Sequence, residues 1–128
     1  MIRAGLYIRV STDEQALHGL SLDSQREALT AYAKEHNMQI VDIYADEGIT
    51  ARKALNKRLQ FQRLIKDVQA GKIDLILVTK LDRWFRNIKD YHNTQEILEK
   101  HNCNWRTIYE NYDTSTASGR LHINIMLS

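Results

Sequence analysis

The sequence predicts an α/β domain with a mainly parallel, open sheet that carries helices on both faces. Three observations lead to this fold class. Strand-like and helix-like stretches alternate along all 128 residues. Residues 73–78, IDLILV, are almost continuously apolar, as is typical of a central parallel strand covered on both faces. No linker or low-complexity tract divides the chain, so we expect a single domain.

The first half of the chain is predicted to contain two strands and two helices. Their expected ranges, in chain order, are 2–10 (strand), 22–37 (helix), 38–45 (strand) and 59–71 (helix). The first helix has apolar residues at helical spacing, and Asp23 or Ser24 can cap its start. The second helix is expected to stop at Gly71, a common residue after a helix end. We expect the acidic turn at residues 46–48 to be solvated.

The second half repeats the alternation. The buried-looking strand at 73–78 is followed by a predicted helix at 87–102, a strand at 104–109 and a helix that opens at Gly119. The chain reaches Ser128 inside this last apolar helix without a cap or a breaker. We therefore expect the natural protein to continue beyond this point.

Composition limits the possible functions only loosely. A net charge of +2 permits a nucleic-acid partner without arguing for one, because a strong electrostatic footprint needs clustered charge. The single cysteine, Cys103, excludes an internal disulfide and is expected to pack beside a strand. No apolar run approaches the roughly 18 residues of a membrane span, so we expect a cytoplasmic protein with no membrane partner.

Two predicted strand ends carry unusual side chains. Arg9 and Ser11 lie two positions apart in the first strand, so their side chains are expected on the same side. The second end is the nonapeptide TKLDRWFRN, residues 79–87. If a helix begins near Asp82, then Asp82, Arg83 and Arg86 share one of its faces. Each stretch alone reads as a solvated end of a strand or helix.

Together, the two ends suggest a phosphate site. In parallel sheets, functional side chains gather at the carboxyl ends of the strands. Arginine binds phosphate oxygens with two parallel donors and stays charged at any accessible pH. A hydroxyl among such arginines serves as a phosphate donor or as a nucleophile. The chemistry that this combination suggests is attack on a phosphodiester.

These motifs also resemble a known family. The matching segments are Arg9-Val10-Ser11-Thr12 with Gln15, Ser21-x-x-x-Gln25, and Lys80-Leu81-Asp82-Arg83-x-x-Arg86. In this order they resemble the catalytic domain of the serine site-specific recombinases, the resolvase/invertase group. The spacing from Gln15 to Gln25 is more similar to the large serine recombinases, which include phage integrases and transposon recombinases.

The resemblance implies a role for each matching residue. Ser11 would be the nucleophile that becomes joined to a DNA 5′ phosphate, with Arg9, Arg83 and Arg86 as cations around the scissile phosphate. Asp82 and Gln25 would support the site, and Asp82 with Arg83 would assist the leaving 3′ oxygen. Arg58 would be a further arginine of the active site. The positions that would contact DNA are Lys80, Thr12 and Gln15. The family often has proline after the arginine at position 58, where this chain has Leu59.

The resemblance also implies partners and domain organisation. The substrate would be double-stranded DNA carrying recombination sites, bound by dimers and tetramers of the full-length protein. Residues 1–128 would be the N-terminal catalytic domain, cut within its long last helix and lacking the DNA-recognition domains, so that this piece alone is inactive. Because arginines neutralise the phosphate and the serine ester retains the bond energy, no cofactor, ATP or metal is expected.

Two other function classes stay open from the residues alone. Acidic residues near strand ends could bind Mg²⁺ in a nuclease or phosphatase; they are Asp13, Glu14, Asp46, Glu47 and Asp82. The neighbouring arginines would oppose such a cation. A non-catalytic signalling module of the same architecture is the other alternative, although a phospho-accepting receiver needs paired acids after its first strand.

Overall fold

The computed structural model describes residues 1–11, 21–48 and 58–128 of the chain. The elements in chain order are β1 (Arg3–Ser11), α2 (Leu22–Glu35), β2 (Gln39–Gly48), α4 (Leu59–Gln69), β3 (Leu75–Val78), the short 3-10 helix η1 (Leu81–Arg83), α5 (Ile88–Lys100), β4 (Asn104–Thr107) and α6 (Ala117–Leu127). Each predicted strand and α-helix is confirmed, with bounds that differ by a few residues.

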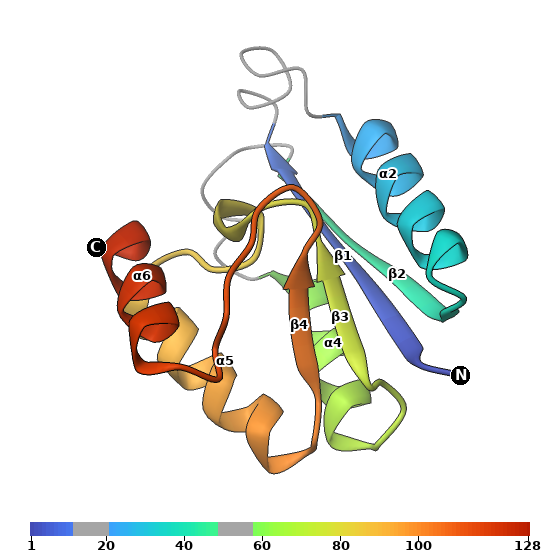
Figure 1. Cartoon of the computed structure of the whole chain (residues 1–128). Helices are drawn as coiled ribbons and strands as arrows, with labels where there is room; N and C mark the ends of the chain where they lie inside the picture. The colour runs from blue at the N-terminus through green and yellow to red at the C-terminus, as the bar shows by residue number, and fades with distance from the viewer. Residues whose placement is uncertain (12–20, 49–57) are drawn as a thin grey trace.

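The sheet has four strands in the order β2-β1-β3-β4, and every neighbouring pair is parallel (Figure 1). The predicted fold class is therefore confirmed. The last register pair between β1 and β3 joins Leu6 to Leu77, whereas β1 continues as far as Ser11. The end of β1 therefore extends beside the segment that follows β3, so the two strand ends considered in the sequence lie at the same end of the sheet.

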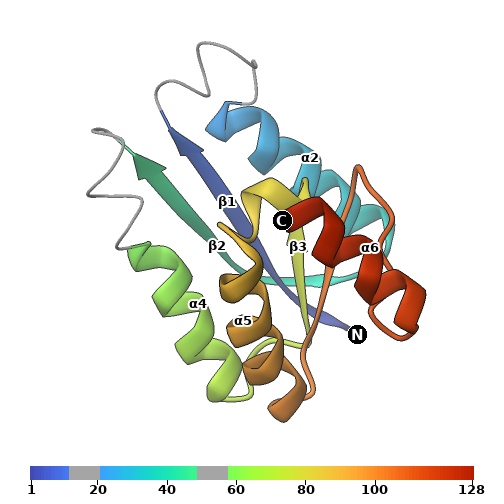
Figure 2. The same cartoon turned by 90° about the vertical axis from the view of Figure 1, so that its left-hand side faces the viewer.

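Helices cover both faces of the sheet. The helix α2 lies on one face, while α4, α5 and α6 lie on the other (Figure 2). Each face of the sheet has its own hydrophobic core, because the side chains of β1 point alternately to the two faces. Leu6 and Ile8 pack with Leu29 of α2, and Tyr7 packs on the opposite face with Leu64 of α4. This alternation also determines on which face the side chains near the end of β1 lie.

The helix ends follow ordinary capping rules, with one correction. Ser21 caps α2, its Oγ accepting from the amide of Ser24, and not Asp23 or Ser24 as predicted. The helix begins at Leu22, so the residue that can accept from its first turn is the one before it. At the end of α4, Gly71 has a φ of +75°, a left-handed conformation that glycine adopts without strain, as predicted.

The acidic turn after β2 differs from its prediction. Asp46 is only 7% exposed, not solvated. Its carboxylate accepts from the main-chain amides of Gln60 and Phe61, at 2.9 and 3.1 Å, in the first turn of α4. A carboxylate there satisfies amides that have no partner inside the helix, which explains why an acidic residue is buried at this position.

Among the residues that the structure describes, no helix is both long and apolar enough to cross a membrane.

Candidate active site

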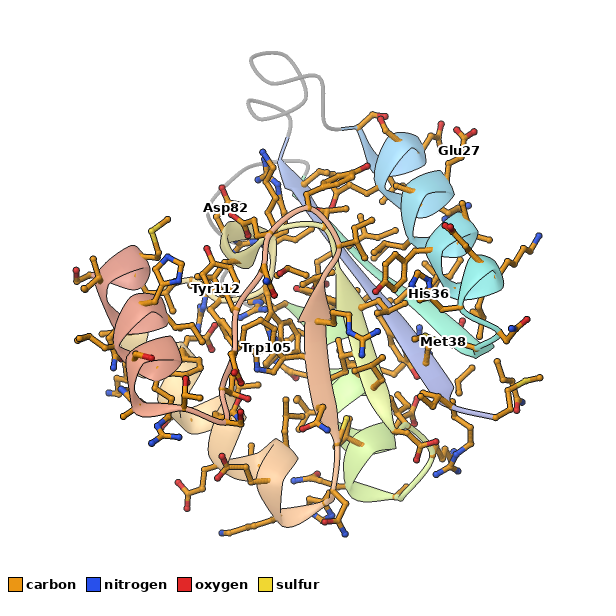
Figure 3. All side chains as sticks on the ribbon, in the orientation of Figure 1. Glu27, His36, Met38, Asp82, Trp105 and Tyr112 are labelled. Carbon is orange, nitrogen blue, oxygen red and sulfur yellow. The ribbon has the colours of Figure 1, made fainter. Side chains whose placement is uncertain are left out.

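The two strand ends singled out by the sequence are in contact. The guanidinium of Arg9 in β1 donates a hydrogen bond to the main-chain carbonyl of Asp82 in η1. Asp82 lies at the carboxyl end of the sheet, near the point where β1 stops (Figure 3). Ser11 is the last residue of β1 and pairs in register with Gly48 of β2. Its side chain lies outside the described part of the structure, as do residues Thr12 and Gln15.

The segment after β3 is not the continuous helix considered above. A single 3-10 turn spans Leu81–Arg83, and α5 begins only at Ile88, with Asn87 as its N-cap. Arg83 is 4% exposed whereas Arg86 is exposed, so the expected shared helical face of Asp82, Arg83 and Arg86 is wrong. The reason lies between them: Trp84 and Phe85 are buried in the core below the sheet end, and Asn87 is fully extended.

Asp82 and Arg83 differ in exposure although they are adjacent. The Asp82 side chain is 72% exposed, and its Oδ1 lies 3.9 Å from Nε of the buried Arg83. Lys80, partly buried, takes the position before η1 in an extended conformation. The segment therefore presents one open carboxylate and the exposed Arg86, with the Arg83 guanidinium held beneath them.

Arg58 is a buried hub. Its side chain is 3% exposed, and its three nitrogens donate to three acceptors: Nε to the Tyr7 hydroxyl at 3.2 Å, Nη1 to Asp90 at 2.7 Å, and Nη2 to the Trp84 carbonyl at 2.7 Å. The guanidinium also stacks on Phe61, 3.8 Å from its centroid. Arg58 itself is left-handed, with a φ of 41°. The structure thus brings Arg58 to the segment that carries the other arginines.

Tyr7 links Arg58 to β2. Its hydroxyl donates to Asp46 at 2.7 Å and accepts from Arg58, so that β1, β2, α4 and α5 share one hydrogen-bonded network. Burial is the main cause that raises the pKa of Tyr7 well above its ordinary value, and the nearby Arg58 charge only partly offsets it. The phenol is therefore a neutral bridge at any working pH.

Gln25 reaches the same sheet end from α2, on the opposite face. This buried amide donates through Nε2 to the Arg9 carbonyl at 3.4 Å, and its Oε1 accepts from the Thr79 hydroxyl at 3.5 Å. Gln25 thereby ties the main chain of Arg9 to the residue that follows β3. It contacts the backbone near Arg9, which fits a supporting role.

The acidic alternative finds no support in the described ranges 1–11, 21–48 and 58–128. Within them, no group of three or more His, Cys, Asp or Glu side chains is placed to hold a metal ion. Both oxygens of Asp46 already accept hydrogen bonds from amide and hydroxyl groups. Asp13 and Glu14 lie outside the described residues, and so does the side chain of Glu47.

Reasoning from the sequence missed three residues of this region, Tyr7, Asp90 and Glu110, and weighed Asp46 only as a metal ligand or as part of a solvated turn. Only Tyr7 gave a usable signal, because it lies two positions before Arg9 in the same strand. Asp90 and Glu110 accept hydrogen bonds from main-chain amides of the segment after β3. Nothing in their local sequence distinguishes them from surface acids.

Comparison with known proteins places these features in context. Residues 4–128 match the family described as the resolvase N-terminal domain. The chain is 34% identical over 122 residues to the transposon Tn917 resolvase of Enterococcus faecalis, covering 95% of this chain and 58% of the relative. It is 36% identical over 97 residues to a putative DNA recombinase of Bacillus subtilis, covering 76% of this chain and 18% of the relative.

A solved structure shows the same fold. The N-terminal catalytic domain of TP901-1 integrase superimposes with a TM-score of 0.76 at 34% identity, over 97% of this chain and 90% of that one. The present chain thus spans nearly all of a solved catalytic domain but only 58% and 18% of the two curated relatives.

Proposed function

This chain belongs to the serine recombinase family and contains its resolvase-type N-terminal catalytic domain, and from this premise we propose that Ser11 is the nucleophile of DNA strand exchange. The Ser11 hydroxyl attacks a backbone phosphorus and loses its proton. The bond from phosphorus to the 3′ oxygen breaks, a 3′ hydroxyl leaves, and a 5′-phosphoserine ester forms. Rejoining is the same exchange with another 3′ hydroxyl as the attacking group.

The observation that carries the proposal is the contact between Arg9 and Asp82. It joins the two motif segments that the reaction needs, one with the nucleophile and one with most of the cations. Ser11 follows Arg9 by two positions in the same strand, and Arg83 and Arg86 follow Asp82 within four. The site is therefore assembled from residues that are far apart in the sequence and adjacent in the fold.

The proposed roles follow from charge. An attacked phosphodiester gains negative charge on its equatorial oxygens, and fixed cations aimed at those oxygens stabilise it most. Arg9, Arg83 and Arg86 are assigned to these oxygens, and Asp82 with Arg83 to the leaving 3′ oxygen. Gln25 supports the end of β1, and Lys80, Thr12 and Gln15 are assigned to DNA contacts. Arg58 is assigned to holding the site together, because its donors are engaged within the protein.

We further propose that the reaction needs neither a metal nor ATP. The arginines supply the positive charge that a divalent ion supplies in nucleases. The phosphoserine ester is itself a phosphodiester, so the energy of the broken bond is kept for rejoining.

The subtype and assembly that we propose are those of a large serine recombinase of the integrase or transposon type. The spacing from Gln15 to Gln25 supports this subtype, as does the much longer Bacillus subtilis relative. In this proposal residues 1–128 form the N-terminal catalytic domain of a longer cytoplasmic protein. Its further domains recognise the recombination sites, and its copies form dimers and tetramers on double-stranded DNA.

Cleavage with and without metal ions tests the proposal against the nuclease alternative. The full-length protein is incubated with its recombination site in EDTA and, in parallel, in Mg²⁺, and the products are separated on a denaturing gel. The expected product in both is DNA with protein attached at its 5′ end. Free 5′-phosphate ends that form only with Mg²⁺ would contradict the proposal.

A further inference from the structure

The two ends of the segment from Leu81 to Arg86 are held by side chains from outside it. After the single 3-10 turn it has no regular structure until α5 begins. The Arg83, Trp84 and Phe85 amides donate to the carbonyls of Lys80 and Leu81, whereas the amides at the two ends, Leu81 and Arg86, donate to carboxylates outside the segment. This segment carries Asp82, Arg83 and Arg86, so whatever holds its main chain also sets where these side chains begin.

One carboxylate holds the start of the segment. The Leu81 amide donates to Oε1 of Glu110 at 2.6 Å. Glu110 follows β4, and its own carbonyl accepts from the Thr107 hydroxyl at 2.9 Å, which fixes its main chain to the last residue of that strand. Burial is the main cause that raises the pKa of Tyr112, and the neighbouring Glu110 carboxylate raises it further.

A second carboxylate holds the end of the segment. Oδ2 of Asp90 accepts from the Arg86 amide at 3.0 Å and from Arg58 Nη1 at 2.7 Å. The Asp90 side chain is only 10% exposed. Its amide is capped by Asn87 Oδ1 at 2.8 Å, so Asp90 sits in a fixed first turn of α5. One oxygen atom thus joins the main chain of Arg86 to the buried hub.

The middle of the segment is held by the guanidiniums of two arginines. Arg58 Nη2 donates to the Trp84 carbonyl, and Arg9 donates to the Asp82 carbonyl. Loss of the Asp90 charge would therefore weaken two contacts of the segment: the one at the Arg86 amide directly, and the one at the Trp84 carbonyl through Arg58. A charge-assisted hydrogen bond is about twice as strong as a neutral one, which makes this carboxylate the main contact at that end.

We propose that Asp90 and Glu110 are positioning residues, which clamp the two ends of the segment 81–86 and thereby aim Arg83 and Arg86 at the scissile phosphate. The inference rests on the proposed function, since it concerns the rate of the same reaction. Both carboxylates accept from main-chain amides, so they hold the segment through its backbone. A displacement of about 1 Å at a reacting group can lower a rate on the order of 10²-fold.

The test measures cleavage and DNA binding separately in the full-length protein. The variants are D90N, D90A and E110A, with E96Q as the matched control, because Glu96 is an exposed acid of α5 that pairs with Lys100 at the surface. We expect D90A and E110A to lower the single-turnover cleavage rate on the order of 10²-fold while affinity for the site is unchanged. D90N, which keeps an acceptor for the Arg86 amide, should lose less, and E96Q should match the wild type.

Amide hydrogen exchange in the same variants tests the clamp itself. D90A should accelerate exchange at the Arg86 amide and E110A at the Leu81 amide. The Tyr91 amide, which donates to the carbonyl of Asn87 at the N-cap of α5, should keep its wild-type protection in both. Its protection also shows that a variant is folded.

The outcomes separate this inference from the proposed function. An active wild type with unchanged cleavage in D90A and E110A overturns the inference alone. A loss of cleavage that is proportional to the loss of DNA binding or of folding across the variants also overturns the inference alone. A wild type that never becomes attached to DNA through Ser11 overturns the proposed function and, with it, this inference.

Discussion

The guanidinium of Arg9 donates a hydrogen bond to the main-chain carbonyl of Asp82, although 73 positions separate the two residues in the chain. The contact follows from the strand order, since β1 and β3 are parallel neighbours and β1 is the longer of the two. The end of β1 therefore lies against η1. A strand end with an arginine and a serine is joined in this way to a segment with two more arginines.

Arg58 should matter more for stability than an exposed arginine does. Breaking a buried ion pair by removing one partner costs about 3–5 kcal/mol, because the other charge is left buried. We expect R58M to lower the free energy of unfolding by about this amount. R58K should also destabilise the protein, since one ammonium cannot reach Tyr7, Asp90 and Trp84 in the arrangement of a guanidinium fork. Urea denaturation measures both.

Arg63 offers the matched control for Arg58. It pairs with Asp42 at 2.6 Å, but both side chains are well exposed. An exposed pair contributes about 0–1 kcal/mol, so R63K should shift the unfolding free energy by less than about 1 kcal/mol. Equal losses in R58K and R63K would show that the buried hub does not contribute as described.

Substitution of Arg83 or Arg86 should lower the cleavage rate, but only substitution of Arg83 should also lower the stability of the fold. Both are assigned to the phosphate, so alanine at either is expected to slow DNA cleavage by on the order of 10²–10³. Arg86 is exposed, and R86A should change the unfolding free energy by no more than about 0.5 kcal/mol. Arg83 is buried, and R83A should also destabilise the fold. Cleavage by R86A at the wild-type rate would remove Arg86 from the site.

Acid should weaken one contact near the start of the chain. Arg3 donates to Asp74 from its main-chain amide and from its guanidinium, at 2.9 to 3.1 Å. These bonds lower the pKa of Asp74 from 3.8 to about 2. When folding lowers the pKa of a carboxyl group, the folded state is stabilised at any pH above the pKa of that group in the unfolded chain. This stabilisation is lost as the pH falls toward the pKa of the group in the folded protein.

The difference in the free energy of unfolding between wild type and D74N should therefore be constant above about pH 5 and shrink between about pH 4 and 2. Urea midpoints measured from pH 2 to 6 test this dependence. A difference that stays the same through pH 2 would mean that the Arg3 contact does not depend on the Asp74 charge.

Cys103 should be chemically inert in the folded protein. It is buried just before β4, and burial raises the pKa of its thiol to about 12. Only the thiolate reacts, so we expect an aromatic disulfide reagent at pH 8 to label the native chain slowly and the urea-unfolded chain quickly. Rapid labelling without denaturant would contradict the packing role predicted from the sequence.

Local pattern was enough to predict the fold class. The apolar run of β3, the helical spacing in α2 and α4, and Gly71 each act over a few residues, and each was confirmed. The motifs around Arg9 and Asp82 were sufficient to place two strand ends together. These features depend on neighbours along the chain or on the general rule for parallel sheets.

The rest of the site depends on tertiary contacts that no local pattern records. Asp46 looked like part of a solvated turn because its three donors come from β1 and α4. The helix considered near Asp82 does not form because the core takes up Trp84 and Phe85, and α5 starts only after Asn87. Arg58 was expected in the site, but its partners, Tyr7 in β1, Trp84 after η1 and Asp90 in α5, could not be identified from the sequence around it.

Mapping the amino acid that becomes attached to DNA tests the central claim most directly. The full-length protein is incubated with a recombination site that carries a nick to trap the cleaved state, digested with protease, and analysed by mass spectrometry. The account predicts a single phosphodiester link at Ser11, with no adduct in S11A. Attachment at any other residue, or an adduct that persists in S11A, would contradict it.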